Sequence, residues 1–104
     1  MNNNNLLEDA KELSKAFLET ETVKKYLLAK KTLEEDKRLN ALKNEIVRRK
    51  KDLKNIAFEA RGAEVKSIKE LQASYDNDSL VVTYQELKEK VEEMEQSIRD
   101  LFII

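Results

Sequence analysis

Apolar residues recur at alternating spacings of four and three along the last quarter of the chain. The ladder consists of Leu80, Tyr84, Leu87, Val91, Met94, Ile98 and Leu101. Nearly every position between these residues is charged or polar. The period predicts a helix from Leu80 to about Phe102, roughly 35 Å long at 1.5 Å per residue. A helix with so narrow an apolar stripe is stable in water only when it lies along another helix.

A second ladder with the same period occupies the middle of the chain. It consists of Leu39, Leu42, Ile46, Arg49, Leu53, Ile56 and Ala60. Arg49 interrupts it and is either exposed at the edge of the seam, which we favour, or paired with a carboxylate across a helix interface. Gly62, the only glycine, predicts that this helix ends near Arg61, because glycine commonly takes the left-handed position after a helix C-terminus.

Three shorter apolar stripes predict further helices. They are Leu6, Ala10, Leu13 and Phe17; Val23, Tyr26, Ala29 and Leu33; and Val65, Ile68, Leu71 and Tyr75. Asn5 is the predicted cap of the first helix, with Glu8 as its capping-box partner, and Thr20 or Thr22 is the predicted cap of the second. Asp36 either caps a new helix or lies inside a continuous one, and the polar residues 76–79 predict a turn.

The composition favours helices throughout. The 104 residues include no Pro and one Gly, whereas proteins built from strands need many turn residues. We expect an all-α protein with a flexible tail over residues 1–5 and a single domain over 6–104. The expected architecture is a long antiparallel helical hairpin with shorter helices packed on it, associating as a bundle-like oligomer, at least a homodimer. The predicted oligomer or partner interface is the seam formed by Tyr84, Leu87, Val91, Met94, Ile98 and Leu101.

The absence of Cys and His narrows the chemistry. It removes disulfides, thiol nucleophiles, the commonest general base and the commonest transition-metal ligands. Glu89 and Glu93 lie one helical turn apart, but they flank the seam and are predicted to be solvated. We therefore predict a protein that is not an enzyme and has no catalytic residue, metal or cofactor. Since no apolar run suits a signal peptide or a membrane span, we expect a cytoplasmic protein without membrane contact.

The net charge of −1 conceals a basic block between two acidic ones. Residues 24–54 carry 12 Lys and Arg against 5 Asp and Glu, whereas residues 1–23 and 55–104 have net charges of −3 and −5. The densest basic run, a candidate contact for an anionic partner, is Arg48, Arg49, Lys50, Lys51 and Lys54. The other interpretation, which we favour, is a solvated face that opposes the acidic segments. The acidic flanks make a nucleic-acid partner the less favoured one.

The apolar pattern resembles the YlbF/YmcA family of small helical bacterial regulators. The similar positions in the first half are Ala10, Leu13, Phe17, Thr20, Val23, Tyr26, Ala29, Leu33 and Asp36. Those in the second half are Leu71, Tyr75, Asn77, Val81, Tyr84, Leu87, Met94 and Ile98. The resemblance covers nearly the whole chain, and its motif is a helix-packing pattern rather than a catalytic signature.

The resemblance implies a non-enzymatic helical hairpin that self-associates. Characterised members of that family act in a multi-protein complex that adjusts ribonuclease Y-dependent RNA processing, and through it competence, biofilm formation and sporulation. The implied partners are paralogous family members or ribonuclease Y-associated proteins. Several members bind iron–sulfur clusters through cysteines in C-terminal extensions, and that role does not transfer to a chain without cysteine.

Three hypotheses follow for function. The first is a regulatory or adaptor protein of the family type, which acts by protein–protein contact. The second is a nucleic-acid-binding module that uses the basic block of residues 24–54. The third is a structural helical oligomer.

Overall fold

The protein consists of helices connected by short turns. The computed structural model describes residues 3–103, and no strand occurs among them. The elements are α1 (Asn3–Leu18), α2 (Glu21–Glu35), α3 (Lys37–Asp52), the 3₁₀ turn η1 (Leu53–Asn55), α4 (Phe58–Asp76) and α5 (Ser79–Asp100). The predicted all-α class is confirmed. Of the predicted tail, residues 1 and 2 lie outside the described residues and residues 3–5 belong to α1.

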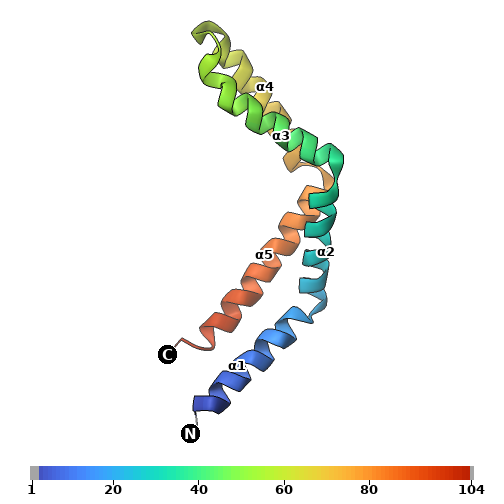
Figure 1. Cartoon of the computed structure of the whole chain (residues 1–104), viewed down its shortest axis with the longest axis vertical. Coiled ribbons are helices and arrows are strands. Elements are labelled where there is room, and N and C mark those ends of the chain that lie inside the picture. The colour runs from blue at the N-terminus through green and yellow to red at the C-terminus, as the bar shows by residue number, and fades with distance from the viewer. Residues whose placement is uncertain (1–2, 104) are drawn as a thin grey trace.

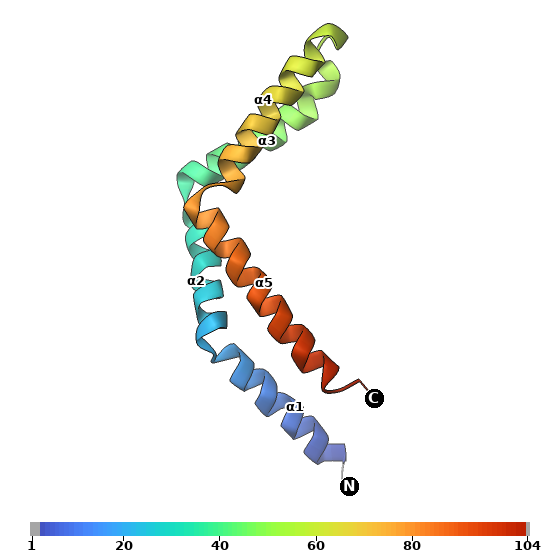
Figure 2. The same ribbon diagram turned by 180° about the vertical axis from the view of Figure 1, so that it is seen from behind.

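The helices form two antiparallel pairs placed end to end with a bend between them (Figures 1 and 2). Helix α3 packs on α4, and α2 packs on α5, while α1 continues beyond α2 toward the end where both termini lie. We call α3, η1 and α4 the upper arm, and α1, α2 and α5 the lower arm. The molecule measures 69 × 27 × 16 Å. Its radius of gyration is 20.5 Å, whereas a compact domain of this length has about 13 Å.

Side-chain caps set the positions of the breaks between helices. The Thr20 hydroxyl accepts a hydrogen bond from the Val23 amide at 3.4 Å, so Thr20 is the cap of α2 as predicted. Asp36 accepts one from the Leu39 amide at 2.8 Å, which resolves the question at this position in favour of a break. The first helix starts earlier than predicted, since Asn5 lies inside α1. Each cap satisfies amide groups that a helix start leaves without a partner.

The bend between the arms is joined by one ion pair. Arg38, at the start of α3, donates to the Asp78 carboxylate at 2.5 Å, and Asp78 also accepts from the Leu80 amide as the cap of α5. The side chain of Asp78 is only 14% exposed. The guanidinium of Arg38, and then the Leu80 amide, hold the pKa of Asp78 below its ordinary value of 3.8. The ion pair between Arg38 and Asp78 therefore links the two segments of the chain that cross the bend.

The apolar core is small, and all but one of its members come from the predicted stripes. Its buried members among the described residues are Val23, Leu39, Ile46, Ile68, Val81 and Val91, of which Val81 lies beside the predicted ladder residue Leu80 and not in the ladder itself. Beside it, Tyr26 of α2 and Tyr84 of α5 stack with ring centroids 5.6 Å apart and planes 20° apart. Hydrogen bonding with Tyr84, and then burial, raises the pKa of the Tyr26 hydroxyl above 10.0. Helices α2, α3, α4 and α5 therefore each use an apolar stripe against one antiparallel neighbour, whereas the stripe of α1 has no such neighbour within the described residues.

The predicted helix end at Gly62 is wrong. The middle helix ends at Asp52, ten residues earlier, and Gly62 lies inside α4 without a positive φ. The chain turns back through η1 and an extended Ile56, whose amide donates to the Leu53 carbonyl at 3.2 Å. The basic last turn of α3 suits a helix C-terminus, because cations there interact favourably with the helix dipole. The apolar ladder of the sequence continues through this turn to Ala60, so its spacing gives no sign that α3 ends at Asp52.

Replacing Gly62 by alanine should therefore stabilise the protein. A Cβ atom at this position meets nothing within 4 Å, and glycine inside a helix costs about 0.5–1 kcal/mol relative to alanine. We expect Gly62→Ala to raise the free energy of unfolding in urea by that amount, and the matched Ala63→Gly to lower it by a similar amount. Destabilisation by Gly62→Ala would show that this residue does not lie in a regular helix.

Stability should fall in acid partly through the Arg38–Asp78 pair. Since the pKa of Asp78 is depressed on folding, its contribution is complete above the unfolded pKa and is lost as the pH falls through the folded pKa, below about pH 4. Asp78→Asn retains a capping side chain but removes the charge. We expect Asp78→Asn to weaken the pH dependence of the melting temperature most, Arg38→Gln to weaken it less because the Leu80 amide still lowers the pKa of Asp78, and Lys37→Gln to leave it unchanged. An unchanged dependence in Asp78→Asn would exclude a role for the pair.

Candidate interaction surfaces

The protomer exposes far more surface than a compact protein of its mass. The accessible area is 8265 Å² for 12.2 kDa, whereas the scaling for folded monomers gives about 6,100 Å². The difference of about 2,200 Å² follows from the two-helix cross-section of each arm, which leaves one side of every helix uncovered. Large apolar side chains on this surface include Leu6, Leu7, Leu18, Leu27, Leu28, Leu101 and Ile103.

The predicted seam of α5 divides into two halves. In the first half, Tyr84 stacks on Tyr26, Leu87 lines a hollow with residues of α2, and Val91 is buried, so this half packs inside the protomer. In the second half, Met94 and Ile98 face α1, and Leu101 is 69% exposed. The part of the seam that remains available to a partner is the half nearest the C-terminus.

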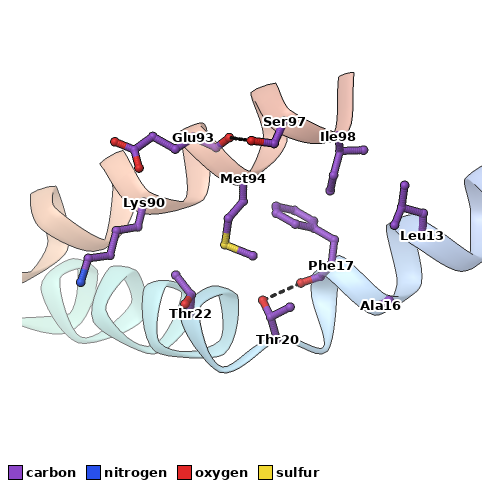
Figure 3. A pocket seen from close by; sticks show the side chains of 10 residues that line it. All are labelled: Leu13, Ala16, Phe17, Thr20, Thr22, Lys90, Glu93, Met94, Ser97 and Ile98. Atoms are coloured by element: carbon purple, nitrogen blue, oxygen red, sulfur yellow. Dashed lines mark hydrogen bonds between the residues drawn. The ribbon is translucent and has the colours of Figure 1, made fainter. Parts of the chain in front are cut away.

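An apolar groove separates α1 from this half of α5. No Cα atom of α1 lies within 8 Å of one in α5, and side chains line the space between them, a groove of about 590 Å³. Phe17 and Met94 point toward one another across it, with Leu13 and Ile98 at one end (Figure 3). The Thr20 hydroxyl donates to the Phe17 carbonyl at 2.8 Å and fixes the turn at the base of the groove. The sequence predicted that Leu13 and Phe17 lie on an apolar face of a helix, but it did not indicate that no other helix packs closely against that face.

The basic run is divided between paired and unpaired cations. Arg48 pairs with Glu45 at 2.6 Å and with Asp52 at 3.5 Å within α3. Lys50, Lys51 and Lys54 are exposed and have no ion pair in the described part of the chain. Of the five predicted contacts for an anion, only these three lysines project freely from the end of the upper arm.

The favoured interpretation of Arg49 as an exposed seam residue is wrong. Its guanidinium binds Glu45 at 2.8 Å and reaches α4, where it donates to the Ser67 hydroxyl at 3.0 Å and lies 3.6 Å from Glu64. Arg48, and then Arg49, lower the pKa of Glu45 below 4.5. The interruption of the ladder is thus a polar contact between α3 and α4, the alternative that the sequence left open.

Phe58 is the surface residue that the sequence analysis missed. It is the first residue of α4, at the end of the upper arm, and it is 79% exposed. Arg61 donates to the carbonyls of Ile56 and Lys54, at 3.0 and 3.2 Å, and so holds the turn before it. The available signal was that Phe58 lies off the ladder, between Ile56 and Ala60, where a helix stripe has no place for an apolar residue.

Two glutamates of α5, one helical turn apart, lie on its exposed face. Glu89 and Glu93 are both exposed on α5, and within residues 3–103 no group of three or more acidic side chains is placed to hold a metal ion. No helix in the same range is both long and apolar enough to cross a membrane.

Comparison with known proteins identifies the family. No curated protein and no solved structure matches the chain. One family model does match, described as control of competence regulator ComK, YlbF/YmcA, and the match covers residues 6–102. It spans α1 nearly from its start, both arms and the whole of α5. The chain therefore belongs to the YlbF/YmcA family of regulators.

Proposed function

We propose that this protein is a non-enzymatic cytoplasmic regulator that acts by protein–protein contact and first of all associates with itself. The family is described as one that controls a competence regulator, which supports a regulatory role. A link to ribonuclease Y-dependent RNA processing, through paralogous or ribonuclease Y-associated partners, is the version of this role that the resemblance implies. The protein would serve in it as an adaptor.

The uncovered surface of the protomer carries this proposal. About 2,200 Å² of excess surface per protomer is within the range that large obligate interfaces bury. Exposed leucines and isoleucines lie on both α1 and the end of α5, on either side of the apolar groove. Contiguous apolar surface of this kind is typical of interaction sites, because its transfer from water stabilises a complex. A partner helix or a second copy would supply the layer that each arm lacks.

We expect the protein to be at least a homodimer at micromolar concentration. Association should bury apolar surface and so give a stable complex with a negative heat-capacity change. Light scattering coupled to size exclusion measures the mass of the eluting species independently of its elongated shape. Sedimentation velocity provides a second measurement of the mass. A clean monomer of 12.2 kDa at high micromolar concentration would contradict self-association.

The competing function is nucleic-acid binding by the end of the upper arm. Lys50, Lys51 and Lys54 are exposed at the same end of the upper arm as the exposed aromatic residue Phe58, a combination that suits single-stranded RNA. Against it stands the acidic lower arm, since residues outside 37–76 carry 9 Lys and Arg and 15 Asp and Glu. A polyanion is repelled by that arm, so we favour a protein partner.

We therefore expect no RNA complex tighter than the roughly 10⁻⁶ M of non-specific binding at physiological salt. Changing Lys50, Lys51 and Lys54 together to glutamine should weaken any RNA binding that occurs at low salt, because phosphate contacts are lost. The dependence of the affinity on salt should become less steep for the same reason. The matched control is Lys88→Gln with Lys90→Gln on α5. A tight, salt-sensitive complex in a gel-shift titration, lost only in the triple variant, would favour the RNA-binding function.

A further inference from the structure

We propose that the end of the upper arm is the ligand of the α1–α5 groove, each copy inserting Phe58 into the groove of a second copy and receiving that copy's Phe58 in return. This inference rests on the self-association proposed above and specifies its geometry. Two surfaces that have no occupant inside the protomer, one convex and one concave, become complementary when two chains lie antiparallel.

Phe58 has the properties of an interface anchor. Its side chain is 79% exposed on a turn that Arg61 holds through two carbonyls, so little conformational freedom is lost when it binds. Aromatic residues that enter apolar pockets contribute a large share of the binding energy of protein interfaces. An isolated phenylalanine at the end of an arm has no neighbour in its own chain that covers it.

The groove offers a suitable receptor for an aromatic ring. Its walls are Leu13 and Phe17 on one side and Met94 and Ile98 on the other, so an entering ring meets an aromatic face and a thioether. Its volume of about 590 Å³ is large enough for a side chain together with part of the turn that carries it. Glu93 and Lys90 are at its margin and leave the interior apolar.

The charges of the two arms are opposite. The upper arm, residues 37–76, carries 11 Lys and Arg against 6 Asp and Glu, a net of +5, while the remaining residues have a net of −6. Lys50, Lys51 and Lys54, at the same end of the upper arm as Phe58, are exposed and form no ion pair within residues 3–103. If the upper arm of each copy lies beside the lower arm of the other, the dimer contains two contacts between a basic and an acidic surface. The same charges disfavour contacts between two upper arms or two lower arms.

The shape of the molecule excludes an intramolecular contact and favours a closed pair. Helix α4, which begins at Phe58, starts at the outer end of the upper arm (Figure 1), whereas the groove lies between α1 and α5 in the lower arm of a molecule 69 Å long. A two-fold axis across the long direction places each end of one chain beside the other end of its partner. Such an isologous dimer satisfies both grooves and both anchors and does not extend into a filament.

Site-specific cross-linking tests this arrangement, because the natural chain has no cysteine. Ala57→Cys labels the turn before Phe58, and Ser97→Cys labels the wall of the groove; both positions are exposed. The two single variants are mixed, allowed to exchange subunits and treated with a short bis-maleimide. We expect a covalent dimer in the mixture and only monomer on denaturing gels when either variant is treated alone.

Each other outcome overturns the proposal in a distinct way. Cross-linking of Ala57→Cys alone would show that two upper arms meet, and cross-linking of Ser97→Cys alone would show that two grooves meet. A dimer by light scattering without the mixed cross-link would refute this geometry and leave self-association intact. A monomer by light scattering would refute self-association itself.

A second variant measures the contribution of the anchor. Phe58→Ala should raise the dimer dissociation constant about 30-fold or more, the effect typical of an anchor residue, while the far-UV spectrum of the protein stays helical. The matched control is Val47→Ala, which also removes exposed apolar surface from the upper arm and should change the constant less than about threefold. Equal effects of the two substitutions would refute the role of Phe58.

Discussion

The narrowness of its apolar stripes constrains everything else in this protein. A helix with one stripe can cover one neighbour, so the chain forms two antiparallel pairs and no third layer. The core is correspondingly small: among the residues whose burial is described, six side chains are buried and none of them is polar. In a closed helical bundle a third or fourth helix covers the remaining faces, whereas in this protein one side of each arm stays exposed. This uncovered surface is what supports the proposed function by protein–protein contact.

Polar residues at a few positions decide how the pairs are joined. Asp36 and Asp78 end one helix pair and begin the other, and Arg38 connects the two crossings of the bend. In the upper arm, Arg49 links α3 to α4 through Ser67 and Glu64. These contacts contribute modestly to stability because they are partly exposed. Their larger effect is on register and direction, which the apolar stripes alone leave free to slide.

The arms also separate charge, and this separation gives the protomer two unlike ends. A basic end carries an exposed aromatic ring, and an acidic arm carries an apolar groove. Family membership places this protein among the YlbF/YmcA regulators. A protein with unlike ends suits assembly with copies or relatives of itself, since orientation is then selected by charge as well as by shape.

The sequence alone determined the class of fold, the starts of α1, α2 and α5 to within a turn or so, and most of the buried stripes. Period and capping chemistry are local properties, and they placed Thr20, the break at residues 76–79 and the seam of α5 correctly. The end of α3, the partner of Arg49 and the open groove were decided only by the tertiary structure. An apolar ladder that continues through a turn has the same pattern as one unbroken helix, so the end of α3 was hidden. Whether a charged residue in a ladder forms a pair depends on the residues of the helix that faces it, as Arg49 shows. The groove exists because the apolar stripes of α1 and α5 do not come into contact. Each depends on the distance between elements, which no local pattern contains.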